Sequence, residues 1–552
     1  MNELTPLEVI SLYPRHNYTL ESLFETRART DPSRPFLFFQ DKTWSWGEFR
    51  AAIDRTARVL ASRGIRRGDR LAVMAANSYA HVLLMFALAR IGAIMVPVNN
   101  EFGVAEARYV LGHAGVGAVA CSKGTLAVAT EACREIDPQP WFVLVDGELD
   151  GIPDLAHVIE SDGGTRLPDD ISADDTCAII YSSGTTGFPK GVMHSQRNFV
   201  LSAEVHVGRT HLQPDGRVLC TLPMFHINAL FYSVGSAVAT GASLVIAPRF
   251  SASQFWRLVA DFGVTHTTIM AAASPILARR SRSEFVRGHP LRVINGSGFT
   301  AETLGIFKNE FGVPTIIEGY GMTEIPAALG NPYEGPHKLS SMGKPCVHPD
   351  PARGWIQVRI LDDEGRDVPA GAAGELAVRT PNIMQGYYRD PEQTAAAFRD
   401  GWFLTGDLVR RDTDGYFFFI ARKKDIIRRR GENIAGSELD RVIGEHPGVL
   451  EVAAIAVDAE LGEDEIMAVV VPKSGAAIRA DDIRRWCAER LAAHKVPRFV
   501  VFVDELPHTP THKVAKFLLK KDPTLRARAE DSQAPAPAPP RSRPPTTLSP
   551  EV

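Results

Sequence analysis

Short apolar runs separated by longer amphipathic stretches fill roughly the first 320 residues and predict an α/β fold. The runs at 69–74, 93–98 and 177–180 have the length and composition of buried strands, and the stretch 79–91 has the pattern of a helix. Strands separated by helices form parallel sheets, because each connection must cross back over the sheet. We therefore expect a large N-terminal domain of layered α/β subdomains.

The C-terminal part of the chain has a different pattern. Residues 356–360 and 374–379 alternate apolar and polar positions around a turn at 362–366, which predicts an antiparallel hairpin in a small barrel-like β subdomain. A basic run at 421–431 indicates a linker, and a small, mobile α+β domain should follow it. The end of the chain is rich in proline and cannot bury a core, so we expect it to be disordered. The expected domains are 1–421, 422–527 and the tail 528–552.

Composition excludes several classes of protein. The 552 residues carry a net charge of −4, so we expect no broad basic surface and no nucleic-acid partner. The six cysteines form no C-x-x-C pair, which favours reduced thiols in a cytoplasm over a zinc site or a disulfide frame. The N-terminus lacks a basic segment, so no signal peptide is expected. The most apolar run, 81–98, is interrupted by Arg90 and Pro97, which argues against a membrane span.

The stretch 181–191 reads Tyr-Ser-Ser-Gly-Thr-Thr-Gly-Phe-Pro-Lys-Gly and carries the first chemical signal. Its glycines let the backbone turn so that successive N–H groups point at one place, and such a nest suits a phosphate. Its hydroxyls add donors and its lysine adds a positive charge. The spacing differs from that of a Walker loop, and an exposed polar turn is the alternative interpretation. The expected phosphate-binding residues are Ser182, Ser183, Gly184, Thr185, Thr186, Gly187 and Lys190.

Together with four later motifs, this stretch resembles the phosphate loop of the adenylate-forming superfamily. That superfamily includes acyl-CoA synthetases, aryl-acid ligases, luciferases and peptide-synthetase adenylation domains. The resemblance covers nearly the whole chain, and among subgroups it is nearest to the carnitine/crotonobetaine-type CoA ligases. It implies ATP, Mg²⁺ and coenzyme A as cofactors and a small carboxylic acid as substrate.

The second motif, Glu-Gly-Tyr-Gly-Met-Thr-Glu at 318–324, resembles the nucleotide-binding turn of the family. The resemblance implies that Tyr320 stacks on adenine, that Thr323 donates to the α-phosphate and that Glu324 binds Mg²⁺. A carboxylate suits Mg²⁺, which prefers hard oxygen ligands. Taken alone, Tyr320 could instead be a core aromatic and Glu324 a helix-start acid. Other expected nucleotide-binding residues are Ser297, Gly298 (where the family usually has proline), Glu318, Gly319, Gly321 and Met322.

Further motifs complete the implied nucleotide site. In Gly-Trp-Phe-Leu-Thr-Gly-Asp, Asp407 resembles the residue that accepts hydrogen bonds from both ribose hydroxyls. Arg422 resembles the arginine that contacts ribose and phosphate, and Lys424 lies at the position of the family's hinge. Gly431 would lie beside the tunnel for pantetheine, where a glycine lets a slender chain pass close to the backbone.

The last motif, 506–516, resembles the segment that carries the family's catalytic lysine. Lys513 falls on that lysine, although His512 stands where glycine is usual. Lys516 is a second candidate, outside the register of the motif.

His226 resembles a residue that flanks the substrate carboxylate and gates the thiol tunnel. The expected catalytic residues are therefore Lys513, Glu324, Thr185 and His226. The expected acid pocket contains no obvious charged partner for the substrate tail. Its lining residues are His226, Ile227, Asn228, Phe231, Gly319, Met322 and Ile325.

The function implied by the resemblance is that of an ATP-dependent acid:CoA ligase. It would form an acyl-adenylate and then an acyl-CoA thioester, releasing pyrophosphate and AMP, as a cytoplasmic monomer or homodimer. A stand-alone adenylation enzyme that loads an acyl or aryl acid onto the phosphopantetheine of a carrier protein is the alternative. Amino-acid-activating relatives usually carry an aspartate where His226 follows Phe225, which argues against α-amino acids. A non-catalytic nucleotide-binding scaffold is the remote alternative.

Overall fold

The computed structural model describes residues 3–149, 151–160, 163–182, 189–270, 273–429, 432–458, 464–508 and 514–533. The chain divides into two compact units, Met1–Ile420 and Ala421–Val552. The larger unit is mixed α/β and the smaller is α+β, so the predicted fold class is confirmed.

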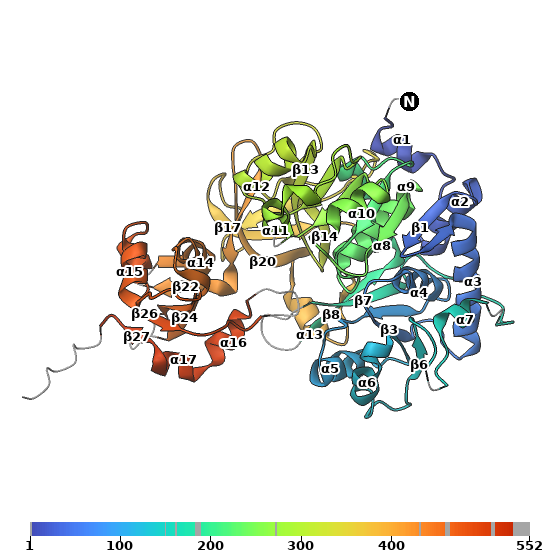
Figure 1. Cartoon of the computed structure of the whole chain (residues 1–552), viewed down its shortest axis with the longest axis horizontal. Helices are drawn as coiled ribbons and strands as arrows, with labels where there is room; N and C mark the ends of the chain where they lie inside the picture. The colour runs from blue at the N-terminus through green and yellow to red at the C-terminus, as the bar shows by residue number, and fades with distance from the viewer. Residues whose placement is uncertain are drawn as a thin grey trace, which may run out of the picture. The chain divides into compact units, whose positions relative to one another are not determined.

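One sheet of the larger unit carries the glycine-rich stretch (Figure 1). Across this sheet the strands are β18 (Gly386–Tyr387), β8 (Lys190–Ser195), β7 (Thr176–Ser182), β4 (Ile94–Pro97), β3 (Arg70–Met74), β5 (Ala118–Cys121) and β6 (Trp141–Leu144). Strands β7, β4, β3, β5 and β6 pair in parallel, whereas β8 and β18 are antiparallel additions at one edge. The parallel strands predicted at 69–74, 93–98 and 177–180 are therefore confirmed.

Helices cover both faces of this sheet. They are α3 (Trp46–Ser62), α4 (Tyr79–Ala89), α5 (Val104–Ala114), α6 (Lys123–Ala132) and α7 (Leu155–Glu160). Side chains alternate along a strand, so Leu71 and Val73 of β3 pack with α3 and α4, while Ala72 and Met74 pack with α5. Helix α3 begins at a capping box formed by Ser45 and Glu48, which satisfies two backbone N–H groups.

A second sheet of the larger unit carries the nucleotide-binding motif predicted at 318–324. Its strands, in order, are β15 (Lys344–Pro345), β14 (Ile325–Gly330), β13 (Thr315–Met322), β12 (Val293–Gly296), β11 (His266–Ile269), β9 (Arg217–Cys220), β10 (Ser243–Ile246), β1 (Pro35–Phe39) and β2 (Lys42–Ser45). One face packs on α10 (Phe255–Asp261), α11 (Ala273–Arg279), α12 (Ala301–Gly305) and η3 (Ile306–Glu310). The short helix η2 (Arg282–Glu284) follows α11. Strand β13 pairs in parallel with β12 and antiparallel with β14, so the motif runs into a tight hairpin.

A layer of buried helices lies between these two sheets (Figure 1). It contains α2 (Leu20–Thr30), α8 (Gln196–Thr210), the π-helix η1 (Asn228–Val234) and α9 (Gly235–Thr240), with α1 (Pro6–Ser11) beside it. Helix α8 is buried on nearly every side, and it carries two charged side chains, Glu204 and Arg209, that are buried with it. A charge in such a position needs a partner.

An antiparallel sheet forms the rest of the larger unit. It consists of β16 (Gln357–Leu361), β17 (Ala373–Arg379), β20 (Trp402–Arg411), β19 (Phe398–Arg399) and β21 (Phe417–Arg422), with α13 (Pro391–Ala396) preceding β19. Ile360 pairs with Leu376, so the hairpin predicted around the turn at 362–366 is confirmed. Strand β20 carries Asp407.

The smaller unit has its own core. Its elements are η4 (Lys423–Asp425), β22 (Ile426–Arg429), β23 (Glu432–Ala435), α14 (Gly436–Gly444), β24 (Val449–Asp458), β25 (Asp464–Pro472), α15 (Ala480–Ala488), η5 (Ala493–Lys495), β26 (Phe499–Phe502), α16 (Lys516–Lys521), α17 (Pro523–Arg528) and β27 (Glu530–Asp531). Alternate residues of β25 pack on opposite faces: Ile466 with α14 and α15, and Met467 with α16 and α17.

The start of the predicted disordered tail needs correction. Residues 528–533 are ordered, because β27 pairs with β26 and Asp531 accepts two hydrogen bonds from the Arg498 guanidinium, at 2.8 and 2.9 Å. This ion pair joins residues far apart in sequence, so composition alone missed it. Residues 534–552 lie outside the described part of the chain.

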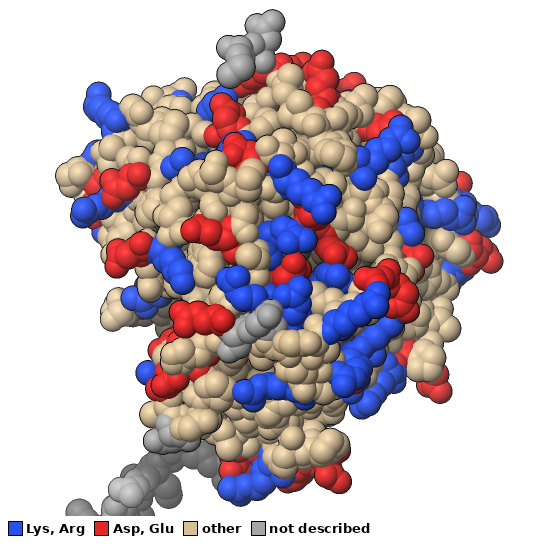
Figure 2. All heavy atoms as spheres, turned by 90° about the vertical axis from the view of Figure 1, so that its right-hand side faces the viewer, with Lys and Arg blue, Asp and Glu red and all other residues tan. Residues whose placement is uncertain are grey.

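The surface of the molecule mixes both signs of charge. Figure 2 shows Lys and Arg interspersed with Asp and Glu over the face that it displays, in keeping with the net charge of −4. Within the described ranges, every helix is too short or too polar to cross a bilayer.

Candidate active site

The glycine- and hydroxyl-rich stretch connects two paired strands. Strand β7 ends at Ser182 and β8 begins at Lys190, and these two residues lie opposite each other in the antiparallel ladder. Ser183, Gly184, Thr185, Thr186 and Gly187 lie outside the described residues. The sheet therefore fixes both ends of the stretch in which we expect the phosphate nest.

Tyr387 connects Lys190 to Glu324. The Lys190 ammonium lies 4.7 Å from the centroid of the Tyr387 ring, in cation–π contact. The Tyr387 hydroxyl donates a hydrogen bond of 2.9 Å to Glu324 Oε1. Burial, followed by the nearby Glu324 carboxylate, raises the pKa of Tyr387, so the phenol stays protonated and remains a donor. The expected phosphate lysine and the expected Mg²⁺ ligand thus meet at one place.

Sequence reasoning missed Tyr387. Tyr387 lies in the short strand β18, which pairs with β8. The backbone N–H of Met384, shortly before β18, donates a hydrogen bond of 2.9 Å to the Glu324 carbonyl. This bond brings Glu324, at the start of β14, close to Tyr387. No recognisable motif surrounds residue 387, and its role depends on this long-range pairing.

One face of β13 carries the residues expected to hold the nucleoside. The Tyr320 hydroxyl donates a hydrogen bond of 2.6 Å to Asp407 Oδ2. Glu318 Oε1 accepts a hydrogen bond of 3.1 Å from the N–H of Phe299, directly after Ser297 and Gly298. Burial raises the pKa of Glu318, and backbone N–H donors oppose that shift. Gly298 has φ +75°, a conformation that proline, the usual family residue here, cannot adopt.

The opposite face of β13 is formed by glycines. A Cβ on Gly319 would lie only 1.7 Å from Nη2 of Arg209, and a Cβ on Gly321 would lie 3.0 Å from the hydroxyl of Tyr232. Side chains alternate across a strand, so Gly319 and Gly321 lie on the face opposite that of Glu318 and Tyr320. The Arg209 guanidinium contacts Gly319, one of the residues expected to line the acid pocket.

A buried histidine holds the end of the motif. His194 Nε2 lies 2.7 Å from the Thr323 carbonyl, and the Asn198 side-chain amide lies 3.2 Å from His194 Nδ1. Burial lowers the pKa of His194 to about 4, so the ring is neutral near pH 7. The two partners then assign Nε2–H as donor and Nδ1 as acceptor. Sequence reasoning missed this histidine as well.

The segment expected to line the acid pocket begins at His226. The ring of His226 is half-buried beside that of Phe225, with centroids 4.4 Å apart. Ile227 and Asn228 are also half-buried, whereas Phe231 is fully buried and packs edge-on against His194. Met322 lies beside Tyr320, its sulfur 3.8 Å from the hydroxyl, and Ile325 is buried at the start of β14.

The remaining expected site residues belong to the smaller unit. Arg422 ends β21, and the Lys424 carbonyl in η4 accepts a hydrogen bond of 3.1 Å from Lys520. Gly431 and Lys513 lie outside the described residues. Lys516 forms an ion pair with Asp440 and donates to the Ala454 carbonyl at 3.0 Å, which gives this second candidate lysine a structural role.

The Glu324 carboxylate fits the chemistry of a Mg²⁺ ligand. It is a hard oxygen donor, 5% exposed, and Tyr387 orients one of its oxygens. Among the residues that the structure describes, His, Cys, Asp and Glu do not gather in groups of three or more that could hold a metal. Mg²⁺ often binds through one carboxylate together with phosphates and waters, so a single acid is a suitable protein ligand.

Comparison with known proteins identifies the family. The model of AMP-binding enzymes matches residues 24–388, and that of the AMP-binding enzyme C-terminal domain matches 438–513. A sulfoacetate–CoA ligase of Cupriavidus necator is 33% identical over 91% of this chain and 97% of its own length. An indoleacetate–CoA ligase of Aromatoleum aromaticum is 31% identical over 90% and 96%. The crystal structure of ATP-bound MatB from Rhodopseudomonas palustris superposes with a TM-score of 0.79 at 28% identity, over 92% of this chain and 98% of that one.

A crotonobetaine/carnitine–CoA ligase of Salmonella paratyphi B is also a relative, 29% identical over 87% of this chain and 93% of its own length. The resemblance found in the sequence is therefore confirmed, and the chain belongs to the family of AMP-binding enzymes.

Proposed function

We propose that this enzyme activates a small or medium carboxylic acid with ATP and transfers the acyl group to coenzyme A. The chain is an AMP-forming acid–CoA ligase, the class to which the relatives named above belong. Two observations support the proposal. The expected phosphate lysine, Lys190, and the expected Mg²⁺ ligand, Glu324, both contact Tyr387. Tyr320, expected at adenine, donates a hydrogen bond to the expected ribose acceptor, Asp407.

In the first step, a carboxylate oxygen of the acid would attack the α-phosphorus of ATP, and pyrophosphate would leave. Both reactants are anions, so the main tasks of the site are to bring them together and to screen their charge. Lys190, the N–H groups of 183–187 and, as proposed from the motif, Lys513 would supply positive charge. Mg²⁺ held by Glu324 would neutralise phosphate oxygens when it is bound. Asp407 and Tyr320 would position the nucleoside.

In the second step, the thiol of coenzyme A would attack the carbonyl carbon of the acyl-adenylate, and the bond to AMP would break. The reaction needs no covalent enzyme intermediate, because AMP is already a good leaving group. We propose that the smaller unit reorients about Lys424, so that Lys513 is replaced by the loop that carries Gly431. His226 would lie at the boundary between the acid and the thiol.

A screen of pyrophosphate release across carboxylic acids of different length and ring content tests the proposal. Acids that release pyrophosphate should yield equimolar AMP and acyl-CoA when coenzyme A is added. Transfer to a holo-carrier protein in place of coenzyme A would favour the alternative adenylation enzyme. Failure of every acid to release pyrophosphate would overturn the proposal.

The identity of the acid is not fixed by the relatives, because their names include an acid with a sulfonate and an acid with an indole ring. A cytoplasmic location and a monomeric or homodimeric state remain predictions.

A further inference from the structure

Arg209 is a buried charge for which the described part of the chain supplies no counter-ion. It lies in the last turn of α8, it is 8% exposed, and its Nε is buried without a hydrogen-bond partner. Among the residues that the structure describes, no aspartate or glutamate forms an ion pair with its guanidinium. The Nε of Arg27, buried in the same layer, is unpartnered as well, but the Arg27 Nη2 donates to the Ala239 carbonyl at 2.7 Å.

The guanidinium lies against the acid-facing side of β13. Gly319 and Gly330 pair directly opposite each other in the β13–β14 ladder. A Cβ on Gly319 would lie 1.7 Å from Nη2 of Arg209, and a Cβ on Gly330 would lie 2.8 Å from its Nε. Two opposed glycines weaken a strand pair, so they mark a place where another group must approach the backbone. That group is the Arg209 side chain.

The side chains around Arg209 do not neutralise it. His206, about one turn earlier on α8, is buried with both ring nitrogens unpartnered and stacks on Tyr232 at 4.9 Å. Burial, and then the charge of Arg209, hold the pKa of His206 well below its usual value, so the ring is neutral. Burial raises the pKa of Tyr232 to about 12, so its phenol is neutral too.

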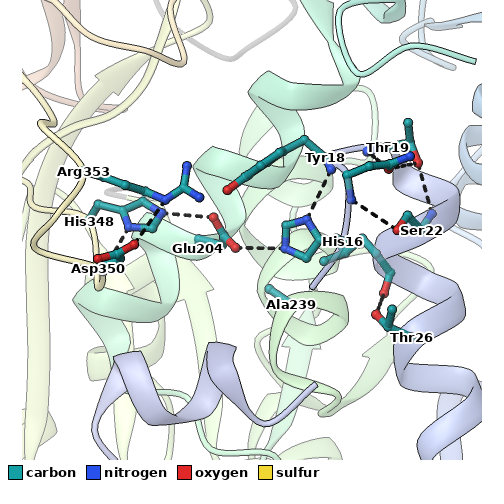
Figure 3. Close-up of polar contacts among 12 residues, drawn as sticks. His16, Tyr18, Thr19, Ser22, Thr26, Glu204, Ala239, His348, Asp350 and Arg353 are labelled. Carbon is teal, nitrogen blue, oxygen red and sulfur yellow. Dashed lines mark hydrogen bonds and ion pairs between the residues drawn. The ribbon is translucent and has the colours of Figure 1, made fainter. Parts of the chain in front are cut away.

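Glu204, the acidic residue on the same helix, already has two partners. Both carboxylate oxygens of Glu204 are taken by histidines, His16 at 3.1 Å and His348 at 3.0 Å (Figure 3). Among the described residues, no acid is therefore left to neutralise Arg209, so its positive charge is available to a ligand.

We propose that Arg209 binds a second acidic group of the substrate, so that the enzyme prefers acids with a carboxylate or sulfonate at the end remote from the reacting carboxylate. A buried charge is costly unless it is paired. The planar fork of a guanidinium matches the oxygens of these two anions in two parallel hydrogen bonds. The unpartnered nitrogens of His206 lie beside it as a further hydrogen-bonding group. The inference rests on the proposed function, which binds the acid beside Gly319.

Matched sets of acids test the inference, each set having the same number of carbon and sulfur atoms in its main chain. Each set contains a monoacid, its dicarboxylic counterpart and its terminal sulfonate: propanoate, malonate and sulfoacetate, or butanoate, succinate and 3-sulfopropanoate. We expect kcat/KM for pyrophosphate release to be about 100-fold higher for the best doubly acidic member than for its monoacid, because a buried charged site rejects a ligand that leaves it unpaired. The carboxylate and sulfonate arms show which anion is preferred.

The Arg209→Met variant should reduce this ratio to about one, since a neutral side chain no longer distinguishes the two acids. Arg209→Lys keeps the charge but not the fork, and should give an intermediate ratio. Arg197→Met is the matched control, because Arg197 lies on the same helix and is paired with Asp174 at the surface; it should leave the ratio unchanged. The wild-type thermal midpoint should also rise with the doubly acidic ligand, and this rise should be absent in Arg209→Met.

The outcomes separate the two proposals. Turnover of monoacids without a preference for double acids, or a preference that survives Arg209→Met, would overturn the inference and leave the proposed function intact. No pyrophosphate release from any acid would overturn both. An equal fall in kcat/KM for both members of a pair in Arg209→Met would show that Arg209 only supports the fold, and would also overturn the inference.

Discussion

Helix α8 carries two buried charges that the rest of the protein treats in opposite ways. Glu204 is 4% exposed and receives a histidine at each oxygen (Figure 3), whereas Arg209 is 8% exposed and has no anionic partner among the described residues. Removing either charge from water is unfavourable in free energy. We infer that a buried charge whose hydrogen bonds are all made by the protein stabilises the fold, and that a buried charge without an anionic partner binds a ligand.

Glu204 has a structural task. His16 precedes α2 and His348 follows β15, so the carboxylate ties two distant segments to one helix. Burial alone would raise the pKa of Glu204, but the hydrogen bonds from His16 and His348 outweigh it and lower the pKa to about 2. The carboxylate therefore stays ionised, and its charge helps to hold both histidines.

Removing each charge in turn is the most direct test of the difference between Glu204 and Arg209. Glu204→Ala leaves the buried His348 and the half-buried His16 without their shared carboxylate, so we expect the free energy of unfolding of the larger unit to fall by about 3–5 kcal/mol. Arg209→Met removes a charge without a partner and should leave stability unchanged or raise it. Denaturant unfolding followed by tryptophan fluorescence measures both. Equal losses in the two variants would end the distinction.

The pH dependence of stability sharpens the same contrast. The pKa of Glu204 falls from the ordinary 4.5 to about 2 on folding, so its contribution is fully present above pH 4.5 and is lost as the pH falls toward 2. A shift of this size corresponds to roughly 3 kcal/mol. Acid titration of stability should show this loss in the wild type and in Arg209→Met, and a shallower one in Glu204→Gln. Identical slopes in all three would contradict the assignment.

Glu324 is an intermediate case, since Tyr387 donates to one of its oxygens and we propose that it also binds Mg²⁺. Tyr387→Phe removes a hydrogen bond to a charged group, worth about 1.5–3 kcal/mol. We expect kcat/KM for adenylation to fall about tenfold and the Mg²⁺ requirement to rise. Tyr388→Phe is the neighbouring control, because the Tyr388 hydroxyl donates a long hydrogen bond of 3.5 Å to the backbone carbonyl of Ala114. A similar loss in both variants would remove the special role of Tyr387.

The smallest effect is expected in the smaller unit. Lys516 and Asp440 form a partly buried pair, and burial is the main cause of the raised pKa of Asp440. Lys516→Met should cost about 1 kcal/mol of stability and leave adenylation close to that of the wild type. A loss of adenylation on the order of 100-fold would instead transfer the proposed catalytic role from Lys513 to Lys516.

The sequence predicted what depends on local pattern. The parallel strands around 69–98 follow from apolar runs, and the hairpin around 362–366 follows from alternation. Tyr320 and Asp407 could be named in advance because each lies in a recognisable short motif. The structure adds that they share a hydrogen bond.

The residues that the sequence did not reveal owe their roles to long-range pairing. Tyr387 matters because β18 pairs with β8, and His194 because its ring reaches the Thr323 carbonyl. In the sequence, nothing distinguishes Arg209 from other helical arginines. Its environment depends on the register of β13 and β14, which places Gly319 opposite Gly330 next to the guanidinium. No local rule connects residues in three separate segments, so such contacts require the fold.

The paired glycines constrain how the substrate range could change over generations or by design. Even an alanine at 319 would overlap the Arg209 guanidinium, so the arginine side chain would have to move away or be replaced by a smaller one. The reverse order is open, because a shorter side chain at 209 leaves both glycines in place. Substitutions at 209, 319 and 330 should therefore be energetically coupled, and an alanine at 319 should be better tolerated once residue 209 is small.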